Sequence, residues 1–331
     1  MKKRITLIAC LAVFAVFGSA AEKNKPESDA LFPFVHEGRW GYMNIKGAVV
    51  IPPQFNEARP FSEGLACVRT GRRFAYIDKK GESIFSVSVA WAGDFSEGLA
   101  RVRLGRDWAY IDKKGQVVLN VEFEAVDDFS EGLAAVMMGD QFGYINKKGE
   151  LVIGPNFDLA RGFYEGLAAV KPRSGFSSVD SDGNVLSDPI WIHSKWGYID
   201  MSGKMVIEPQ FEFAGNFSEG LSCVWIDEGW GYIDAKGKFT IEPKLETARK
   251  FSEGLGVVRR NGKWGYINKS GKTVIEHRFD EAQPFSEGLA RVEVGDKTGY
   301  IDKKGKFIWE PTPGWRPGEH SHGQAHQHHE P

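Results

Sequence analysis

The stretch LGVVRRNGKWGYINKSGKTVI, residues 255–275, decides the fold of this chain. It contains three short apolar runs, separated by Asn261-Gly262 and by Asn268-Lys269-Ser270-Gly271. Asn-Gly is a strong hairpin signal because both residues tolerate positive φ, and a glycine suits the left-handed position of a short hairpin loop. The stretch therefore predicts three short antiparallel strands.

The Trp-Gly-Tyr motif in this stretch returns at a constant interval along the chain. It or a close variant begins at Trp40, Phe74, Trp108, Phe142, Trp196, Trp230, Trp264 and Thr298. A fixed period of roughly 34 residues indicates a repeat protein, in which each unit is too small to bury its own hydrophobic face and stacks on its neighbours. The motif therefore points to folding rather than to catalysis, since every unit carries it.

A second motif, Phe-Ser-Glu-Gly-Leu, lies between consecutive units. Its phenylalanines are Phe61, Phe95, Phe129, Phe163, Phe217, Phe251 and Phe285. The glycine favours a bend. We interpret the seven glutamates as acceptors of backbone hydrogen bonds at that bend, because buried backbone donors need partners.

The interval from Phe142 to Trp196 is longer than one period. Phe176 follows Phe142 by one full period, and the segment after it keeps a turn glycine and a Val-Leu pair. We interpret residues 172–191 as a ninth, degenerate unit. A calcium loop starting at Asp180 is disfavoured, because Trp191 stands where the bidentate glutamate belongs.

Residues 1–21 have the layout of a signal peptide, with a basic start, an apolar run and small residues before the cleavage point. The apolar run is too short for a membrane span of about 20 residues. The chain is therefore expected to be exported, either periplasmic or secreted, and lipid anchoring through Cys10 is the alternative. Residues 22–30 are a polar linker, the repeats span 31–311, and 312–331 form a disordered tail.

Composition excludes some functions. The formal net charge of the 331 residues is −2, so no basic stripe suggests nucleic acid. Cys67 and Cys223 occupy the same slot in distant units, which makes a disulfide between them unexpected.

Together these motifs resemble the WG (KWG) repeats of bacterial proteins over residues 31–311. The resemblance implies an all-β domain, common in exported proteins, without assigned catalytic residues. Eight units plus a degenerate one favour an open, curved array of three-stranded meanders. A closed β-propeller-like ring is the alternative.

The expected function is a non-enzymatic scaffold that binds a protein or glycan partner in the cell envelope. Candidate binding residues depart from the repeat consensus: Trp91, Trp191, His193 and Trp225. Exposed tryptophans stack on sugars or anchor protein partners. The alternative for each is extra packing at an irregular joint between units.

Two other functions remain as alternatives. A polysaccharide-acting enzyme needs a unique pair of catalytic groups, but His36, His193 and His277 each stand alone in the array. No cofactor is expected. The tail could bind zinc, nickel or copper weakly through its clustered imidazoles, and a solvated tail is the alternative. Its histidines are His320, His322, His326, His328 and His329.

Overall fold

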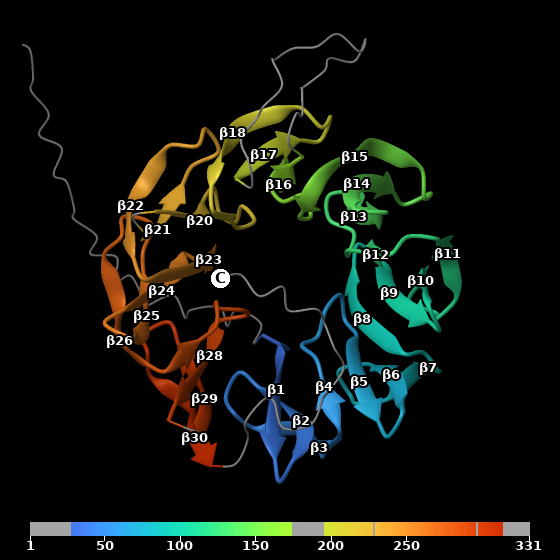
Figure 1. Ribbon diagram of the computed structural model, residues 1–331. Helices are drawn as coiled ribbons and strands as arrows, with labels where there is room; N and C mark the ends of the chain where they lie inside the picture. The colour runs from blue at the N-terminus through green and yellow to red at the C-terminus, as the bar shows by residue number, and fades with distance from the viewer. Residues whose placement is uncertain (1–27, 174–194, 228, 296, 314–331) are drawn as a thin grey trace, which may run out of the picture.

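The computed structural model describes residues 28–173, 195–227, 229–295 and 297–313, and it arranges them as a ring of short antiparallel sheets (Figure 1). The innermost strands are β4 (Glu57–Ala58), β8 (Trp91–Ser96), β12 (Ala125–Val126), β19 (Phe213–Ala214), β23 (Thr247–Ser252) and β27 (Glu281–Ala282). The second strands are β1 (Leu31–His36), β5 (Ala66–Thr70), β9 (Leu99–Leu104), β13 (Leu133–Met138), β16 (Leu167–Pro172), β20 (Ser222–Ile226), β24 (Leu255–Arg260) and β28 (Leu289–Val294). The third strands, which carry the Trp-Gly-Tyr motif, are β2 (Arg39–Asn44), β6 (Arg73–Ile77), β10 (Asp107–Ile111), β14 (Gln141–Asn146), β17 (Trp196–Asp200), β21 (Gly229–Ile233), β25 (Lys263–Ile267) and β29 (Lys297–Asp302). The outermost strands are β3 (Val49–Phe55), β7 (Ser83–Val87), β11 (Val117–Val121), β15 (Leu151–Ala160), β18 (Met205–Phe211), β22 (Phe239–Leu245), β26 (Thr273–Phe279) and β30 (Phe307–Pro313).

The described strands form eight units in chain order, each numbered here from the N-terminus. Unit 1 comprises β1 to β3, and units 2, 3, 6, 7 and 8 are each a four-stranded sheet. Units 4 and 5 share the long strand β15, so β12 to β18 form one seven-stranded sheet. The expected three-stranded meander is therefore corrected to four strands in most units. The added strand arises where the connection after the outermost strand pairs briefly with the second strand, as Ala58 does with Val68.

The all-β class and the tandem array of short sheets are confirmed. The array is open in its strand pairing, because no strand of unit 1 pairs with unit 8 in the described part of the chain. Its two ends nonetheless meet through side chains. Phe32 packs edge-on against Tyr300 with ring centroids 5.7 Å apart, and Phe34 lies 5.0 Å from Trp309. The path of the chain is therefore a ring, as in the propeller-like alternative, and side chains close it (Figure 1).

The ninth unit expected at residues 172–191 falls, beyond Arg173, outside the described residues. On either side of that segment, β16 pairs directly with β17, with Val170 opposite Gly197, as second and third strands pair in the other units. Residues 174–194 therefore connect two neighbouring strands of one sheet. Unit 5 is complete without a strand from that segment.

The tyrosine of each Trp-Gly-Tyr motif joins its unit to the next one. The buried hydroxyl of Tyr144 donates a hydrogen bond of 2.8 Å to the backbone carbonyl of Arg161 in unit 5. The same bond runs from Tyr42 to Arg59, Tyr76 to Gly93, Tyr110 to Asp127, Tyr198 to Gly215, Tyr232 to Arg249 and Tyr266 to Gln283. A buried phenol requires such an acceptor. The motif is therefore structural, as its recurrence predicts.

The motif glycine is required where the outermost strand carries a bulge. A Cβ added at Gly143 would lie 2.6 Å from the carbonyl oxygen of Ile153, because the register between β14 and β15 shifts around this residue. Ala75 and Ala109 replace the glycine in units 2 and 3. There the partner strand passes the alanine in regular register, opposite Ser86 and Asn120.

The Phe-Ser-Glu-Gly-Leu motif forms a two-residue hairpin turn. In unit 2 the turn residues Glu63 and Gly64 both have positive φ, 51° and 87°, as a type I′ turn requires. The Glu63 carboxylate accepts the backbone N–H of Gly98 in unit 3 at 3.0 Å and pairs with Lys113 at 3.1 Å. The same bond to the next bend glycine recurs at Gly132, Gly166, Gly220, Gly254 and Gly288. Within the described residues, the expectation that these glutamates accept backbone hydrogen bonds is confirmed for six of the seven, all except Glu287.

The hydrophobic core is divided among the joints between neighbouring units rather than gathered at one centre. One cluster, for example, combines Tyr266 and Phe279 of unit 7 with Phe285 and Val292 of unit 8. This division follows from the size of the unit, which buries its apolar faces only against its neighbours. No helix long and apolar enough to cross a membrane occurs among the described residues.

Candidate binding site

The residues in or directly after the innermost strands, and Arg161 directly after β15, vary from unit to unit, unlike the motifs. Their carbonyls accept the tyrosine hydroxyl described above, so their backbone is fixed while their side chains are free to differ. We call the following positions the inner-wall row: Arg59, Gly93, Asp127, Arg161, Gly215, Arg249 and Gln283, each with the residue after it. The side chains of the inner-wall row therefore give each joint between units its own charge and polarity.

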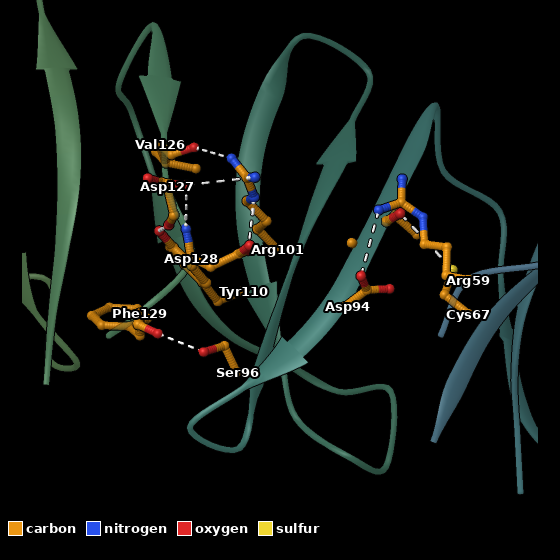
Figure 2. A network of polar contacts seen from close by, with 12 residues as sticks. Arg59, Cys67, Asp94, Ser96, Arg101, Tyr110, Val126, Asp127, Asp128 and Phe129 are labelled. Atoms are coloured by element: carbon orange, nitrogen blue, oxygen red, sulfur yellow. Dashed lines mark hydrogen bonds and ion pairs between the residues drawn. The ribbon is translucent and has the colours of Figure 1, made fainter. Parts of the chain in front are cut away.

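A network of arginine and aspartate side chains spans units 2 to 4 (Figure 2). Arg59 Nη1 lies 3.8 Å from Asp94 Oδ2 in unit 3. Arg101 on β9 lies 3.6 Å from Asp127 and 2.8 Å from Asp128, both in unit 4. Each guanidinium therefore reaches from its own unit to a carboxylate of the next.

The acids of this network are partly desolvated. Burial raises the pKa of Asp94, the charge of Arg59 opposes that rise, and the charge of Asp128 adds to it. Burial likewise raises the pKa of Asp128 against the charge of Arg101. Three carboxylates face two guanidinium groups here, so the ionised network carries one more negative than positive charge.

Trp91, one of the predicted binding residues, begins β8 beside this network. The guanidinium carbons of Arg59 and Arg101 lie 5.0 and 5.2 Å from the centre of its ring. Trp108 meets it edge-on at 5.7 Å. The half-buried Trp91 ring is thus engaged by neighbours on several sides, as in the extra-packing alternative.

Trp225, a second predicted binding residue, lies at the surface. It is 40% exposed, and no other tryptophan in the described part of the chain is exposed to this degree. It stands on β20 directly opposite Phe213 and Trp230, whose rings are 4.9 Å apart. The equivalent position in other units holds Arg69, Arg103, Met137, Lys171, Arg259 and Glu293. A large aromatic side chain is therefore peculiar to unit 6.

The remaining predicted site residues lie outside the described residues. They are Trp191 and His193 in the segment 174–194, and the tail histidines His320, His322, His326, His328 and His329. Within the described residues, no group of three or more His, Cys, Asp or Glu side chains could hold a metal ion.

Burial shifts the pKa values of several described groups that could act as nucleophiles or as acids and bases. Cys67 and Cys223 are free thiols, and burial raises their pKa to about 12 and about 11. Burial lowers the pKa of His277, and the charge of Arg260 lowers it further, so its imidazole is neutral at pH 7. The non-repeated aspartates of units 3 and 4 are engaged by Arg59 and Arg101.

A cavity of about 610 Å³ lies at the seam between units 8, 1 and 2. Unit 1 has no innermost strand among the described residues, and the cavity runs along β1 where other units carry one. Its walls include Phe32, Trp40, Phe61, Arg291 and Tyr300. The joint between units 8 and 1, which closes the ring, therefore also contains a cavity.

The period, the motif slots and the stacked sheets match a known repeat. The model of the WG containing repeat matches residues 40–73, 74–106, 108–141, 142–171, 196–227, 230–264 and 264–297. The chain belongs to the WG-repeat family. The resemblance read from the motifs is therefore confirmed. The matches leave out β1 at the start of unit 1 and, beyond Lys297, β29 and β30 of unit 8. No curated protein matches this WG-repeat chain.

Solved structures resemble this WG-repeat protein in fold. One, titled "Crystal structure of the eukaryotic initiation factor", superposes with a TM-score of 0.59 at 12% identity, covering 86% of this chain and 96% of that one. Another, "Dihydro-heme d1 dehydrogenase NirN in complex with DHE", gives a TM-score of 0.54 at 12% identity, covering 87% of this chain and 73% of that one. At such low identity the likeness concerns the fold alone. It agrees with a propeller-like repeat scaffold.

Sequence reasoning missed most of the polar residues of this WG-repeat protein's inner-wall row. Arg59 and Asp94 of this row belong to no motif, and neither does Arg101 on β9, which pairs with Asp127 and Asp128. A signal existed nonetheless. Aligning the units at their tyrosines places Arg59, Arg161 and Arg249 in one column, where a charged residue beside a buried bend is unexpected.

Proposed function

We propose that this protein is an exported, non-enzymatic scaffold that binds a protein or glycan partner in the cell envelope. Export rests on the leader-like residues 1–21, with the periplasm or the outside of the cell as destination. Repeat rings present broad surfaces, and their specificity resides in positions that the repeat does not demand.

The observation that carries the proposal is the exposed Trp225. Leaving an indole at 40% exposure forfeits hydrophobic stabilisation that a buried position would give. Other units place mainly charged or flexible side chains at this point, so the fold does not require tryptophan there. An indole with one open face can stack on a sugar ring or anchor a protein loop.

A non-enzymatic role is supported by the state of the reactive groups. The described thiols are buried with raised pKa values, and the inner-wall aspartates are paired with arginines. Weak metal binding by the five tail histidines is a separate proposal, because the described residues do not include them.

The test compares the mature chain with Trp225→Arg, which installs the residue type found in units 2, 3 and 7. Both proteins are immobilised and exposed to solubilised envelope material and to a glycan array. We expect Trp225→Arg to lose about tenfold or more of the retained partner, since an aromatic anchor contributes roughly 2 kcal/mol or more. Val118→Arg is the matched control, because Val118 is 52% exposed but lies on an outermost strand. Equal retention by all three proteins, or no retention by the unmodified chain, would refute the proposed function.

A further inference from the structure

Three arginines occupy the same place in three joints of the ring. The backbone carbonyls of Arg59, Arg161 and Arg249 each accept the hydroxyl of the preceding unit's motif tyrosine, at 2.7 to 2.8 Å. Each guanidinium then extends toward the innermost strand of the following unit. The three joints can therefore be compared residue by residue.

Two of the three arginines meet an acid in the following unit. Arg59 lies 3.8 Å from Asp94, the residue directly after Gly93. Arg249 lies 2.5 Å from Glu281. At the third joint, the residue directly after Gly215 is Asn216, and the position equivalent to Glu281 is Phe213. An amide and a phenyl ring thus replace the two acids.

Arg161 consequently has no ion pair and no side-chain hydrogen bond among the described residues. Its guanidinium lies between aromatic rings, with Cζ 5.0 Å from the centre of Trp196 and 4.8 Å from that of Phe213. Its Nε and the Oδ1 of Asn216 are both buried without a hydrogen-bond partner. Asp127, the nearest acid in the preceding unit's row, is held by Arg101.

Burial lowers the pKa of the Arg161 guanidinium, because its surroundings remove water from the charge. Guanidinium groups stay protonated in proteins, so the charge persists and a carboxylate would stabilise it. A guanidinium also presents paired donors that match the two oxygens of a carboxylate. Among the described residues, the joint between units 5 and 6 therefore lacks one group, an anion, that the equivalent joints supply themselves.

From these contacts we infer that Arg161 binds the carboxylate of an acidic sugar, with Trp225 stacking on a sugar ring of the same chain. This rests on the proposed function and specifies its ligand as a uronic-acid glycan. Phe213 links the two residues: it touches Arg161 and stands directly opposite Trp225 on the neighbouring strand. Cross-strand neighbours of this kind have Cβ atoms about 5 Å apart, so a stacking face and a carboxylate site lie within reach of a short oligosaccharide.

A uronate glycan fits this surface better than an acidic peptide. A peptide carboxylate would satisfy Arg161 but would leave the open face of Trp225 without a ring to cover. A uronate combines a carboxylate with a sugar ring whose C–H face stacks on indole. The acidic peptide is therefore the competing outcome in the test.

The experiment measures binding of tetragalacturonic acid to the full mature chain by calorimetry or tryptophan fluorescence. Its neutral methyl ester and a tetraglutamate peptide are the comparison probes. We expect the acid to bind about tenfold or more tightly than either, because hydrogen bonds to charged groups contribute roughly 1.5–3 kcal/mol. Arg161→Gln should lose the same factor.

Asn216→Asp is the decisive variant, since it copies the Arg59–Asp94 pair into this joint. It should abolish preference for the acid over the ester while leaving the melting temperature unchanged or higher, which separates loss of binding from loss of folding. Asp94→Asn, the reciprocal change at the joint between units 2 and 3, is the control and should not weaken binding.

The outcomes separate this inference from the proposed function. If the unmodified chain retains an envelope partner through Trp225 but ignores tetragalacturonic acid, or if Asn216→Asp still prefers the acid, the inference is overturned and the scaffold proposal stands. Binding of tetraglutamate as tightly as the uronate would also overturn it, in favour of an acidic protein segment. If the unmodified chain binds neither an envelope partner nor any of the probes, both the proposed function and this inference are refuted.

Discussion

The hydroxyl of Tyr300 donates a hydrogen bond of 2.8 Å to the backbone carbonyl of Pro33, 267 residues earlier in the chain. The other seven motif tyrosines donate forward to the next unit, and this one donates back to the first. Unit 1 lacks, among the described residues, the innermost strand whose carbonyl would be the regular acceptor, so β1 itself supplies it. The ring thus closes with the same donor that builds every other joint.

Tyr300→Phe should weaken the closure specifically. It leaves the Pro33 carbonyl without its donor and should cost about 1–3 kcal/mol. Hydrogen exchange is expected to accelerate in β1 and β29 while unit 4 keeps its protection. Tyr144→Phe, at an internal joint, serves as control: it should lower stability without exposing β1. Equal protection of β1 in both variants would argue against closure through this bond.

The bend carboxylate of Glu63 predicts an acid-sensitive ring. Burial alone would raise the pKa of Glu63, but hydrogen bonds from Lys113 and the N–H of Gly98, with the charge of Lys113, outweigh it and lower the pKa below its ordinary value of 4.5. A group whose pKa is lowered by folding stabilises the protein above its unfolded pKa, and that contribution disappears as pH falls through the folded value. Stability should therefore decline below about pH 4.5, and denaturant titrations should show a shallower decline for Glu63→Gln.

Glu287→Gln is the control for the bend, because among the described residues Glu287 accepts no hydrogen bond from a backbone N–H of another unit, whereas Glu253 accepts that of Gly288. Its stability and pH profile should match those of the unmodified chain. A loss as large as that of Glu63→Gln would mean that turn conformation, not the contact between units, gives the glutamate its role.

The motif glycine should resist substitution only in bulged units. Gly143→Ala pushes a methyl group to within 2.6 Å of the Ile153 carbonyl and should cost about 1–3 kcal/mol or more. The reverse change, Ala109→Gly, should cost only about 0.5–1 kcal/mol, because it merely adds backbone freedom to a strand. Urea denaturation of the two variants measures the difference; similar losses would contradict the role assigned to the bulge.

The histidine tail can be tested separately from the ring. Truncation after Trp315 removes all five tail histidines. Equilibrium dialysis against zinc, nickel and copper should show lower uptake by the truncated chain, since neutral imidazoles are the expected ligands. Equal metal uptake by the full and the truncated chain would contradict metal binding by the tail.

Much of the fold follows from local sequence. The glycines with positive φ, and the Asn261-Gly262 pair, determine the hairpin turns through local sequence alone. The buried motif tyrosine, Tyr266 in unit 7, recurs in every unit because each joint needs its hydroxyl as a hydrogen-bond donor. The two-residue strands were harder to foresee, because Glu57–Ala58 is too short to show any period. The sequence after Phe176 has a repeat-like pattern, and only the pairing of Val170 with Gly197 reveals that unit 5 is complete without it.

Closure and the candidate site were less accessible from sequence, because both depend on residues far apart in the chain. Phe32 and Tyr300 each look like ordinary core residues of their own units. The exposed Trp225 was identified as a departure from the repeat. Arg161 was not, because its isolation becomes visible only when Asn216 is compared with Asp94 across the ring.

The seam between units 1 and 8 also determines how the ring bears mechanical load. The array's first and last strands, β1 and β30, lie at this one joint, where no backbone pairing crosses in the described part of the chain. A force applied through the two ends would therefore pull first on a few side-chain contacts and one tyrosine hydrogen bond. The seam should act as a latch that yields before any sheet is broken and re-forms when tension is released.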